Sequence, residues 1–366
     1  MTHIFGSAVS RGVRVACSGV LLLTAAARIH AQEAQPQGNP VDKKPYNPPP
    51  AFSSDSIVEF TLHAPFGKLR RDRQTETEYR PAFITYRDSS GTVRVPLRVR
   101  TRGIWRKANC QIPPLMFNFT KDSTKGTLFA RVDRVRFSFH CRDTDDYEQY
   151  VLQEHQLYRV QRLLTPFSFA VRLARVTYID SENNDTLTTR HAFLQEIDEE
   201  FAERQNLKLV QQQGAGPGDL SPYESAFFGV FQYFVANSDY SIRALHNVVL
   251  LLNAPYHVPV ARDFDWSGAV DARYAKPNPV LRIRSVAQRV MRGYCAPAEE
   301  YEKVFQLFRD RKDAIYALYS DPLNVAMKPE VVKKTLRYFD EFYETINDPR
   351  RAQREIVGAC LGGAAN

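Results

Sequence analysis

Several signatures of common enzyme and binding classes are missing from this sequence. It has no C-x-x-C pair and no histidine-rich spacing, which argues against a structural zinc site. Ser267 lies outside any G-x-S-x-G motif, and Gly214–Gly218 reads as a Gly-Pro linker rather than a phosphate-binding loop. Serine hydrolysis and a P-loop are therefore not expected. With 366 residues, 43% of them hydrophobic, the chain can still build one large domain or two lobes.

Long apolar runs are also scarce, and the one at the start has a specific pattern. Val15–Ala27 is apolar, follows Arg11 and Arg14, and is too short to span a bilayer comfortably. A basic stretch, an apolar stretch and small residues in that order predict a signal peptide, residues 1–31, cleaved after Ala31. We therefore expect export to the periplasm or the extracellular space, with no transmembrane segment after signal removal.

Basic residues are not concentrated in one place. The formal net charge is +8, and removing residues 1–31, which hold three arginines and no acids, lowers it to +5. Scattered arginines favour a solvated surface, so we expect no nucleic-acid partner. Residues 32–54 are rich in Pro and Gln and predict a disordered linker.

Cysteines are few but even in number once the signal peptide is gone. Cys17 falls in residues 1–31, which leaves Cys110, Cys141, Cys295 and Cys360. An even set in an oxidising compartment indicates disulfides, for which three connectivities exist. We expect Cys110–Cys141 and Cys295–Cys360, because each bond then staples one region of the chain.

The first part of the folded chain has a β pattern. Short β-branched and aromatic runs separated by turn residues begin at Ile57, and residues 92–100 alternate apolar and basic side chains. A helix is predicted over Asp146–Leu164, followed by a strand pair, 168–180 and 189–201, whose second strand leads into a helix.

The rest of the chain favours helices around one hairpin. Ser221 with Glu224 predicts a capping box at a helix start. Residues 246–262 predict a β-hairpin, and 299–320 and 329–346 are amphipathic helices. These patterns predict an α+β domain over 55–362. Its β-rich N-terminal lobe covers about 55–145, and its mainly helical C-terminal lobe covers about 146–362.

Two carboxylates end the second strand of the predicted hairpin. Asp263 and Asp265 follow the apolar run Val258–Ala261, where uncompensated negative charge is costly. A hairpin brings the start of its first strand beside the end of its second, so Asn247 should lie near them, with the Asp239 loop alongside. Carboxylate and carboxamide oxygens suit Mg²⁺ or Mn²⁺.

A simpler interpretation of the same residues stays open. Asx-rich loops cap turns and helices without binding a ligand. Asp265 can also be neutralised by an arginine such as Arg262, Arg282 or Arg284.

The order of five motifs resembles a known family. RTRGIW, YVLQEHQLYRVQRLL, FLQEIDEEF, VANSDY…HN and ARDFDWSG occur in the order seen in the spore-coat CotH kinase-like family, over roughly residues 57 to 362. The resemblance implies an atypical protein-kinase-like two-lobed fold. It also implies phosphate transfer from ATP, with Mg²⁺ or Mn²⁺, to secreted or envelope proteins.

The resemblance also implies residue roles. Asp239 would orient or deprotonate the acceptor hydroxyl, Asn247 and Asp263 would hold the metal, and Asp265 would be a second ligand. The nucleotide-binding candidates are Arg102, Lys107, Glu154 and Glu196. Arg102, Arg106 or Lys107 would replace a lysine that the family has and this chain lacks. Glu154 would pair with a nucleotide-binding basic residue, and Glu196 matches a glutamate-bearing segment of the family.

Departures from the family pattern leave two rivals open. Asn118 stands where the family has a lysine. This departure favours a non-catalytic envelope or surface-binding protein that keeps the fold. A carbohydrate-acting enzyme using Asp239 and Asp263 is a third interpretation, for which the sequence offers no evident aromatic platform.

Overall fold

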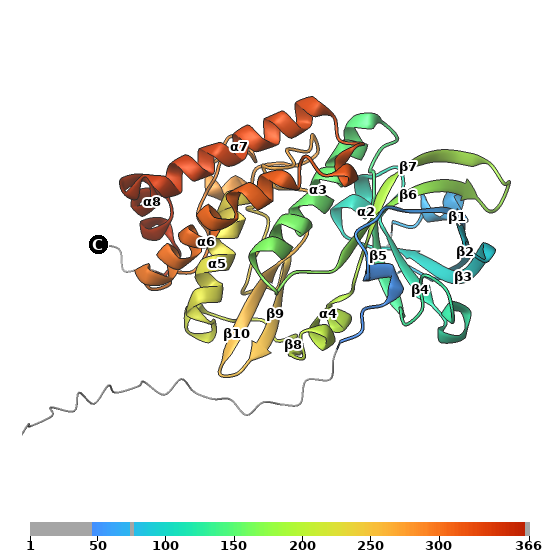
Figure 1. Ribbon diagram of the computed structural model, residues 1–366, viewed down its shortest axis with the longest axis horizontal. Coiled ribbons are helices and arrows are strands. Elements are labelled where there is room, and N and C mark those ends of the chain that lie inside the picture. Colours follow the sequence, from blue (N-terminus) through green and yellow to red (C-terminus); the bar gives the residue numbers. More distant parts are fainter. Residues whose placement is uncertain (1–45, 74–76, 363–366) are drawn as a thin grey trace, which may run out of the picture. The chain divides into compact units, whose positions relative to one another are not determined.

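The structure is a computed structural model that describes residues 46–73 and 77–362. Its first seven strands form a closed barrel (Figure 1). They are β1 (Val58–Ala64), β2 (Arg80–Asp88), β3 (Gly91–Thr101), β4 (Leu115–Phe119), β5 (Arg134–Phe139), β6 (Val171–Asp180) and β7 (Thr186–Gln195). The predicted signal peptide, residues 1–31, lies outside the described residues.

The barrel order is β1-β2-β3-β4-β5-β7-β6, and β1 pairs with β6 in parallel. A parallel pair needs a long crossover connection, and the chain between β1 and β6 provides it. Strands β6 and β7, which follow the long helix in sequence, therefore return to complete the barrel that β1 to β5 began.

The expected kinase-like fold with two lobes is wrong. The β part is a closed barrel rather than an N-terminal lobe, and it recruits residues 171–195 from beyond the expected boundary near 145. The second part is not mainly helical, because it carries a sheet of its own in the order β10-β9-β8. The architecture is a seven-stranded barrel with a mixed α/β remainder.

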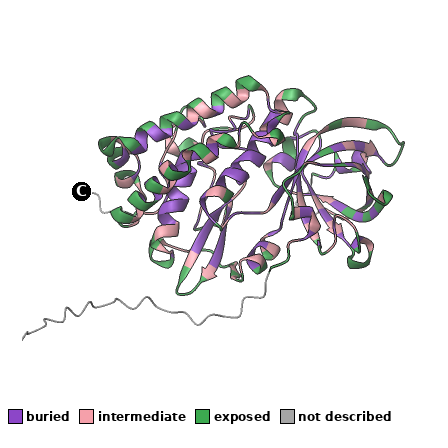
Figure 2. Ribbon diagram, viewed as in Figure 1, coloured by how far each residue is buried: buried purple, intermediate pink, exposed green. Residues whose placement is uncertain are grey.

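Helix α3 (Asp145–Leu164) packs between the barrel and the helices of the second part (Figures 1 and 2). Most of its surface is buried, including the charged and polar side chains of Glu154, His155 and Gln156. The predicted helix is confirmed within one residue, and most of its polar positions face protein rather than water.

Strands β6 and β7 contribute to two hydrophobic cores by period-two alternation. Ala174 and Leu194 pack inside the barrel, whereas Leu173 and Phe193 pack into the core around α3. This two-sided burial joins the barrel to the remainder of the described chain.

The second part combines a small sheet with helices. Its strands are β8 (Lys208–Val210), β9 (Val248–Asn253) and β10 (Tyr256–Ala261), and β9 and β10 form the predicted hairpin. The α-helices other than α3 are α1 (Phe66–Leu69), α2 (Trp105–Asn109), α4 (Asp198–Arg204), α5 (Pro222–Val235), α6 (Ala298–Ala317), α7 (Pro329–Asn347) and α8 (Pro349–Glu355). Short 3₁₀ turns are η1 (Pro50–Phe52), η2 (Lys121–Thr124), η3 (Pro217–Asp219), η4 (Pro279–Leu281), η5 (Pro322–Asn324) and η6 (Val357–Ala359).

The start of α5 is predicted correctly, but its capping box is wrong. The side chain of Ser221 makes no capping hydrogen bond. Glu224 instead lies beside Gln161 and Phe227 in a narrow crevice. Packing of α5 against the β10 side of the sheet therefore outweighs the local cap.

Two disulfides confirm the expected pairing. Cys110 is bonded to Cys141 and Cys295 to Cys360. Such bonds are compatible with an exported protein. Part of the expected linker, residues 46–54, is packed: Ala51 is fully buried, and Arg172 donates to the carbonyl oxygen of Pro50 at 3.0 Å.

Within the described ranges, no helix combines the length and the apolar character needed to cross a membrane.

Candidate metal centre

Three carboxylates meet between α3 and the loop that follows β10. Glu154 of α3, Asp263 and Asp265 each place an oxygen within 4.8 Å of the other two. Glu154 is 3% exposed and Asp265 is 4% exposed, while Asp263 is half-buried. Three acids converging in a buried place need a compensating cation or proton.

The D-x-D spacing is explained by the residue between the two acids. Phe264 is fully buried, and its ring lies 4.8 Å from that of Tyr158 and 5.7 Å from that of Phe231. Asp263 has a left-handed backbone (φ 61°), and its N–H donates to Tyr158 Oη at 2.9 Å. With Phe264 anchored in the core, the flanking carboxylates are directed to a common site.

Two arginines from the barrel side approach the acids. Arg106 of α2 has Nη1 3.7 Å from Glu154 and 3.8 Å from Asp265. Its Nη2 donates to the carbonyl oxygen of Phe139. Arg102 donates to Ser138 Oγ at 2.6 Å. Arg106 is thus the basic residue beside Glu154, and the nucleotide-binding role expected of Glu154 stays a prediction.

These arginines leave the acids undercompensated. Burial and the nearby Asp265 raise the pKa of Glu154 well above its ordinary value, although Arg106 opposes the shift. Burial and Asp263 raise the pKa of Asp265 to about 7, again against Arg106. Burial also lowers the pKa of Arg102 to about 10. Without a further cation, the cluster tends to hold a proton near neutral pH.

An aromatic group borders the acids. Tyr274 Oη donates to Asp265 Oδ2 at 3.0 Å. The ring of Tyr274 stacks on Trp105 at 5.1 Å and on Tyr147 at 6.0 Å, and Trp105 meets Trp266 edge-on at 5.4 Å. Tyr274 is not among the residues predicted from the sequence. No local motif marks it, although Trp105 and Trp266 both stand in the motifs quoted above.

The Asp239 loop forms a second polar group. Asp239 Oδ1 lies 3.2 Å from His246 Nε2, and Asn247 Nδ2 donates to the backbone oxygen of Asp239 at 2.7 Å and to its Oδ2 at 3.1 Å. The hydrogen bond with Asp239 raises the pKa of His246, against burial, and Asp263 adds to the increase. The two groups therefore interact electrostatically.

The β9–β10 hairpin brings the backbone of Asn247 beside Arg262, as expected, whereas the amide group of Asn247 is engaged by Asp239. The carbonyl oxygen of Asn247 accepts from the N–H of Arg262 at 3.2 Å, directly before Asp263. Its amide nitrogen, however, is bound to Asp239, and the third carboxylate of the cluster is Glu154. The metal role of Asn247 stays a prediction.

The remaining candidates lie in different surroundings. Lys107 is buried in α2. Glu196 is 1% exposed; it is ion-paired with Arg204 and accepts from the N–H of Ala170 at 2.7 Å. Arg262 pairs with Asp198 at 2.8 Å rather than with Asp265. The structure thus brings Glu154, Asp263 and Asp265 together and leaves Glu196 engaged elsewhere.

Comparisons with known proteins do not assign the chain. No family model matches it, and no curated protein matches it. The resemblance to the CotH family stays a prediction based on motif order.

Proposed function

We propose that this chain is an exported phosphotransferase that uses Mg²⁺ or Mn²⁺ to transfer phosphate from a nucleotide such as ATP to a protein hydroxyl in the envelope. The observation that carries the proposal is the convergence of Glu154, Asp263 and Asp265 within 4.8 Å. The proposal concerns the chemistry of this site and does not depend on a kinase fold.

The donor set fits a hard divalent cation. Two oxygens bound to one Mg²⁺ at about 2.1 Å can be no more than about 4.2 Å apart. Three oxygens around one Mg²⁺ at this distance cannot all be more than about 3.6 Å apart. The cluster, whose oxygens lie within 4.8 Å of one another, would therefore contract by up to roughly 1 Å on binding Mg²⁺. Ca²⁺, with ligands at roughly 2.4 Å, would need a smaller contraction, so it is the relevant competitor.

The arginines beside the acids suit phosphate. The buried Nε atoms of Arg102 and Arg106 have no hydrogen-bond partner among the described residues. Guanidinium N–H donors bind phosphate oxygens well, so these two arginines are the proposed phosphate contacts. Phosphoryl transfer depends mainly on positioning and on charge stabilisation, and a bound divalent cation would supply part of that stabilisation.

Asp239 is the proposed acceptor-side group. It is half-buried and hydrogen-bonded to His246 and Asn247, which hold its carboxylate in place. In this position it can accept the proton of a substrate hydroxyl. Glu196 is not part of the proposed site, because Arg204 and a backbone N–H already engage its carboxylate.

A non-catalytic binding protein is the second candidate. Arg106 reaches both Glu154 and Asp265, so a guanidinium already occupies part of the space around the acids. Asn118 stands where the resembled family has lysine, and it carries no positive charge. Its Oδ1 accepts a hydrogen bond from Arg98 Nη2 at 3.3 Å. Under this alternative the acids and Arg106 form a structural ion-pair network.

Metal binding and phosphate release test the proposal on the purified chain. Mn²⁺ should bind in electron paramagnetic resonance titrations, and ATP hydrolysis or autophosphorylation should require Mg²⁺ or Mn²⁺. Asp263→Asn and Asp265→Asn should lose both. Asp271→Asn, whose carboxylate pairs with Lys334 at the surface, is the matched control.

Binding of Mn²⁺ without any nucleotide turnover would favour the non-catalytic candidate. Absence of Mn²⁺ binding at millimolar concentration, with Ca²⁺ also inactive, would contradict both the metal centre and the enzyme.

A further inference from the structure

The barrel has one weak seam, between β1 and β2. These strands share three residue pairs, from His63–Phe83 to Thr61–Thr85. On its other side β1 pairs with β6 from Val58 to Ala64, and β2 pairs with β3 from Arg80 to Asp88. Residues 58–60 and 86–88 therefore have strand neighbours on one side only.

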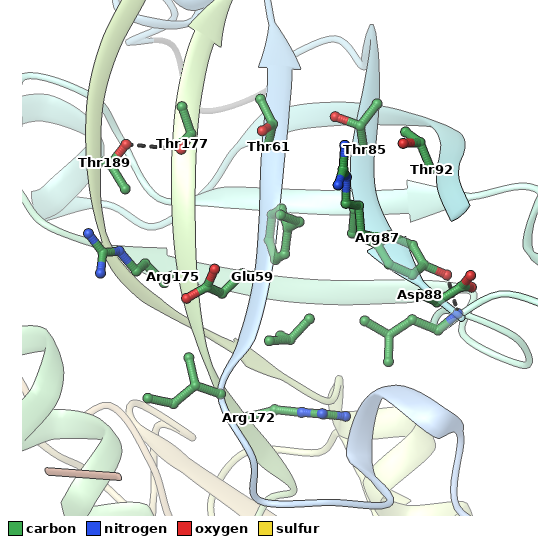
Figure 3. Close-up of a pocket in the computed structure, with 15 residues that line it drawn as sticks. Glu59, Thr61, Thr85, Arg87, Asp88, Thr92, Arg172, Arg175, Thr177 and Thr189 are labelled. Carbon is green, nitrogen blue, oxygen red and sulfur yellow. Dashed lines mark hydrogen bonds between the residues drawn. The ribbon is translucent and has the colours of Figure 1, made fainter. Parts of the chain in front are cut away.

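The two strands diverge below the last shared pair (Figure 3). A groove of about 830 Å³ opens there, lined by residues of both strands and by the neighbouring strand β6. Unpaired strand edges present backbone N–H and C=O groups, which readily pair with another extended chain. The groove thus lies where main-chain hydrogen bonds of the barrel are unfilled.

The inner wall of the groove is apolar. Phe60 and Tyr86 are 4% and 8% exposed and point into the barrel, and Leu128 lines the same space. The N–H of Leu128 donates to Tyr86 Oη at 2.7 Å, which fixes the base of the groove. A chain inserted at the seam would therefore meet apolar side chains on its inner face.

The outer wall is polar and carries charges of both signs. Glu59, Arg87 and Arg175 line the groove and are exposed, and none of their side chains has an ion pair or hydrogen bond with another described residue. Thr61, Thr85, Thr177 and Thr189 form a row of hydroxyl-bearing residues across β2, β1, β6 and β7.

We propose that the β1–β2 seam binds an extended segment of another polypeptide by strand addition. The backbone of the segment would fill the unpaired edges, which provides affinity without sequence dependence. Its alternate side chains would be apolar toward Phe60 and Tyr86 and polar toward Glu59 and Arg87, which provides selectivity. This inference is independent of the metal centre and of the proposed phosphate transfer.

The first experiment screens seven-residue peptides with valine at every second position and Lys, Glu, Ser or Thr between. The best-binding peptide is then compared, by fluorescence anisotropy, with versions methylated on alternate backbone nitrogens. If the peptide binds by strand addition, methylating those of its backbone nitrogens that hydrogen-bond to the barrel should lower its affinity at least tenfold. Equal affinity of the methylated peptides, or no binding by any peptide of the screen, would overturn the proposal.

A second measurement locates the peptide. Amide hydrogen exchange should slow in residues 58–60 and 86–88 when the peptide is present. Glu59→Lys and Arg87→Glu should change the charge preferred at the polar positions, while the fold stays intact because neither side chain has a partner to lose. Arg71→Glu, an exposed arginine that does not line the groove, should leave the preference unchanged. Protection confined to other strands would contradict strand addition at this seam.

The chain's own N-terminal region is the competing occupant. A chain beginning at residue 46 should bind the peptide with the same affinity as a chain beginning at residue 32. Binding that appears only after residues 32–45 are removed would mean that this segment fills the seam, and would overturn the proposal of an external partner.

Discussion

Tyr274 donates a hydrogen bond to Asp265 at 3.0 Å while its ring stacks on Trp105 at 5.1 Å. One side chain therefore links a carboxylate of the candidate metal centre to α2, the helix that carries Arg106. Partners of this kind fix the orientation of a ligating carboxylate and commonly change metal affinity by roughly 10- to 100-fold.

The first prediction concerns that hydrogen bond. Tyr274→Phe keeps the stacked ring but removes the donor, so Mn²⁺ affinity should fall by roughly tenfold. Electron paramagnetic resonance titration measures the change. Tyr147→Phe alters a neighbouring ring that does not hydrogen-bond the cluster and should leave the affinity unchanged. Equal affinity of Tyr274→Phe and wild type would show that Asp265 needs no positioning by Tyr274.

The second prediction separates two roles of Arg106. Arg106→Met removes the cation that compensates Glu154 and Asp265, so stability without metal should fall by about 3–5 kcal/mol. Apart from a proton, a divalent cation is then the species that can neutralise the acids, so the Mn²⁺-induced rise in melting temperature should exceed that of wild type.

Arg204→Met provides the matched control for Arg106. It breaks another buried arginine–glutamate pair, with Glu196, and should lose stability without changing the Mn²⁺-induced shift. A smaller shift for Arg106→Met than for wild type would count against a metal at the three carboxylates.

The third prediction compares the two disulfides. Each closes a loop, of 31 and 65 residues, and loss of either should cost about 3–5 kcal/mol of stability. Cys110 ends α2 next to Arg106, so replacing Cys110 and Cys141 by alanine should also weaken nucleotide binding. The Cys295→Ala, Cys360→Ala pair should affect stability alone. Denaturant melts and a nucleotide titration give the two readouts. If both double substitutions changed nucleotide affinity equally, α2 would not be part of the nucleotide site.

The fourth prediction is a pH dependence of stability from Glu224. Burial raises the pKa of Glu224 to about 7, above its ordinary value. Between its unfolded pKa and about pH 7, the folded state binds more protons than the unfolded state, so this residue's contribution to stability is lost as pH rises through that window. Glu224→Gln should be more stable than wild type at pH 8, by roughly 1–3 kcal/mol, and nearly equal to it at pH 4. Parallel pH profiles of the two proteins would contradict this assignment.

The fifth prediction concerns Gly268, which ends the D-W-S-G stretch. A Cβ at this position would lie 2.6 Å from the backbone oxygen of Val286 and 2.9 Å from Ala236 Cβ. Gly268→Ala should therefore destabilise the fold by about 1–3 kcal/mol and displace the Asp265 loop, which lowers Mn²⁺ affinity. Gly218→Ala meets no atom within 4 Å and should be tolerated. Wild-type stability and affinity of Gly268→Ala would show that the loop can shift without cost.

The sequence by itself determined the features that depend on short-range pattern. The alternation around Phe264 places Asp263 and Asp265 together, the β9–β10 hairpin brings Asn247 beside Arg262, and the cysteine count with export favours both disulfides. The long helix α3 and the start of α5 follow from helical spacing and from Pro222. Each of these signals lies within a few residues of the structure that it predicts.

Only the tertiary structure decided which faces of the helices and strands pack against one another. Barrel closure joins Val58 to Ala174, and the candidate metal centre joins Glu154 to Asp265, across more than a hundred residues of chain. Periodicity shows that a side chain is buried but not what it is buried against, because that depends on the path of the loops and on the packing of whole elements. For the same reason no sequence pattern indicated Tyr274, and the patterns suggested two lobes where β6 and β7 return to complete a barrel.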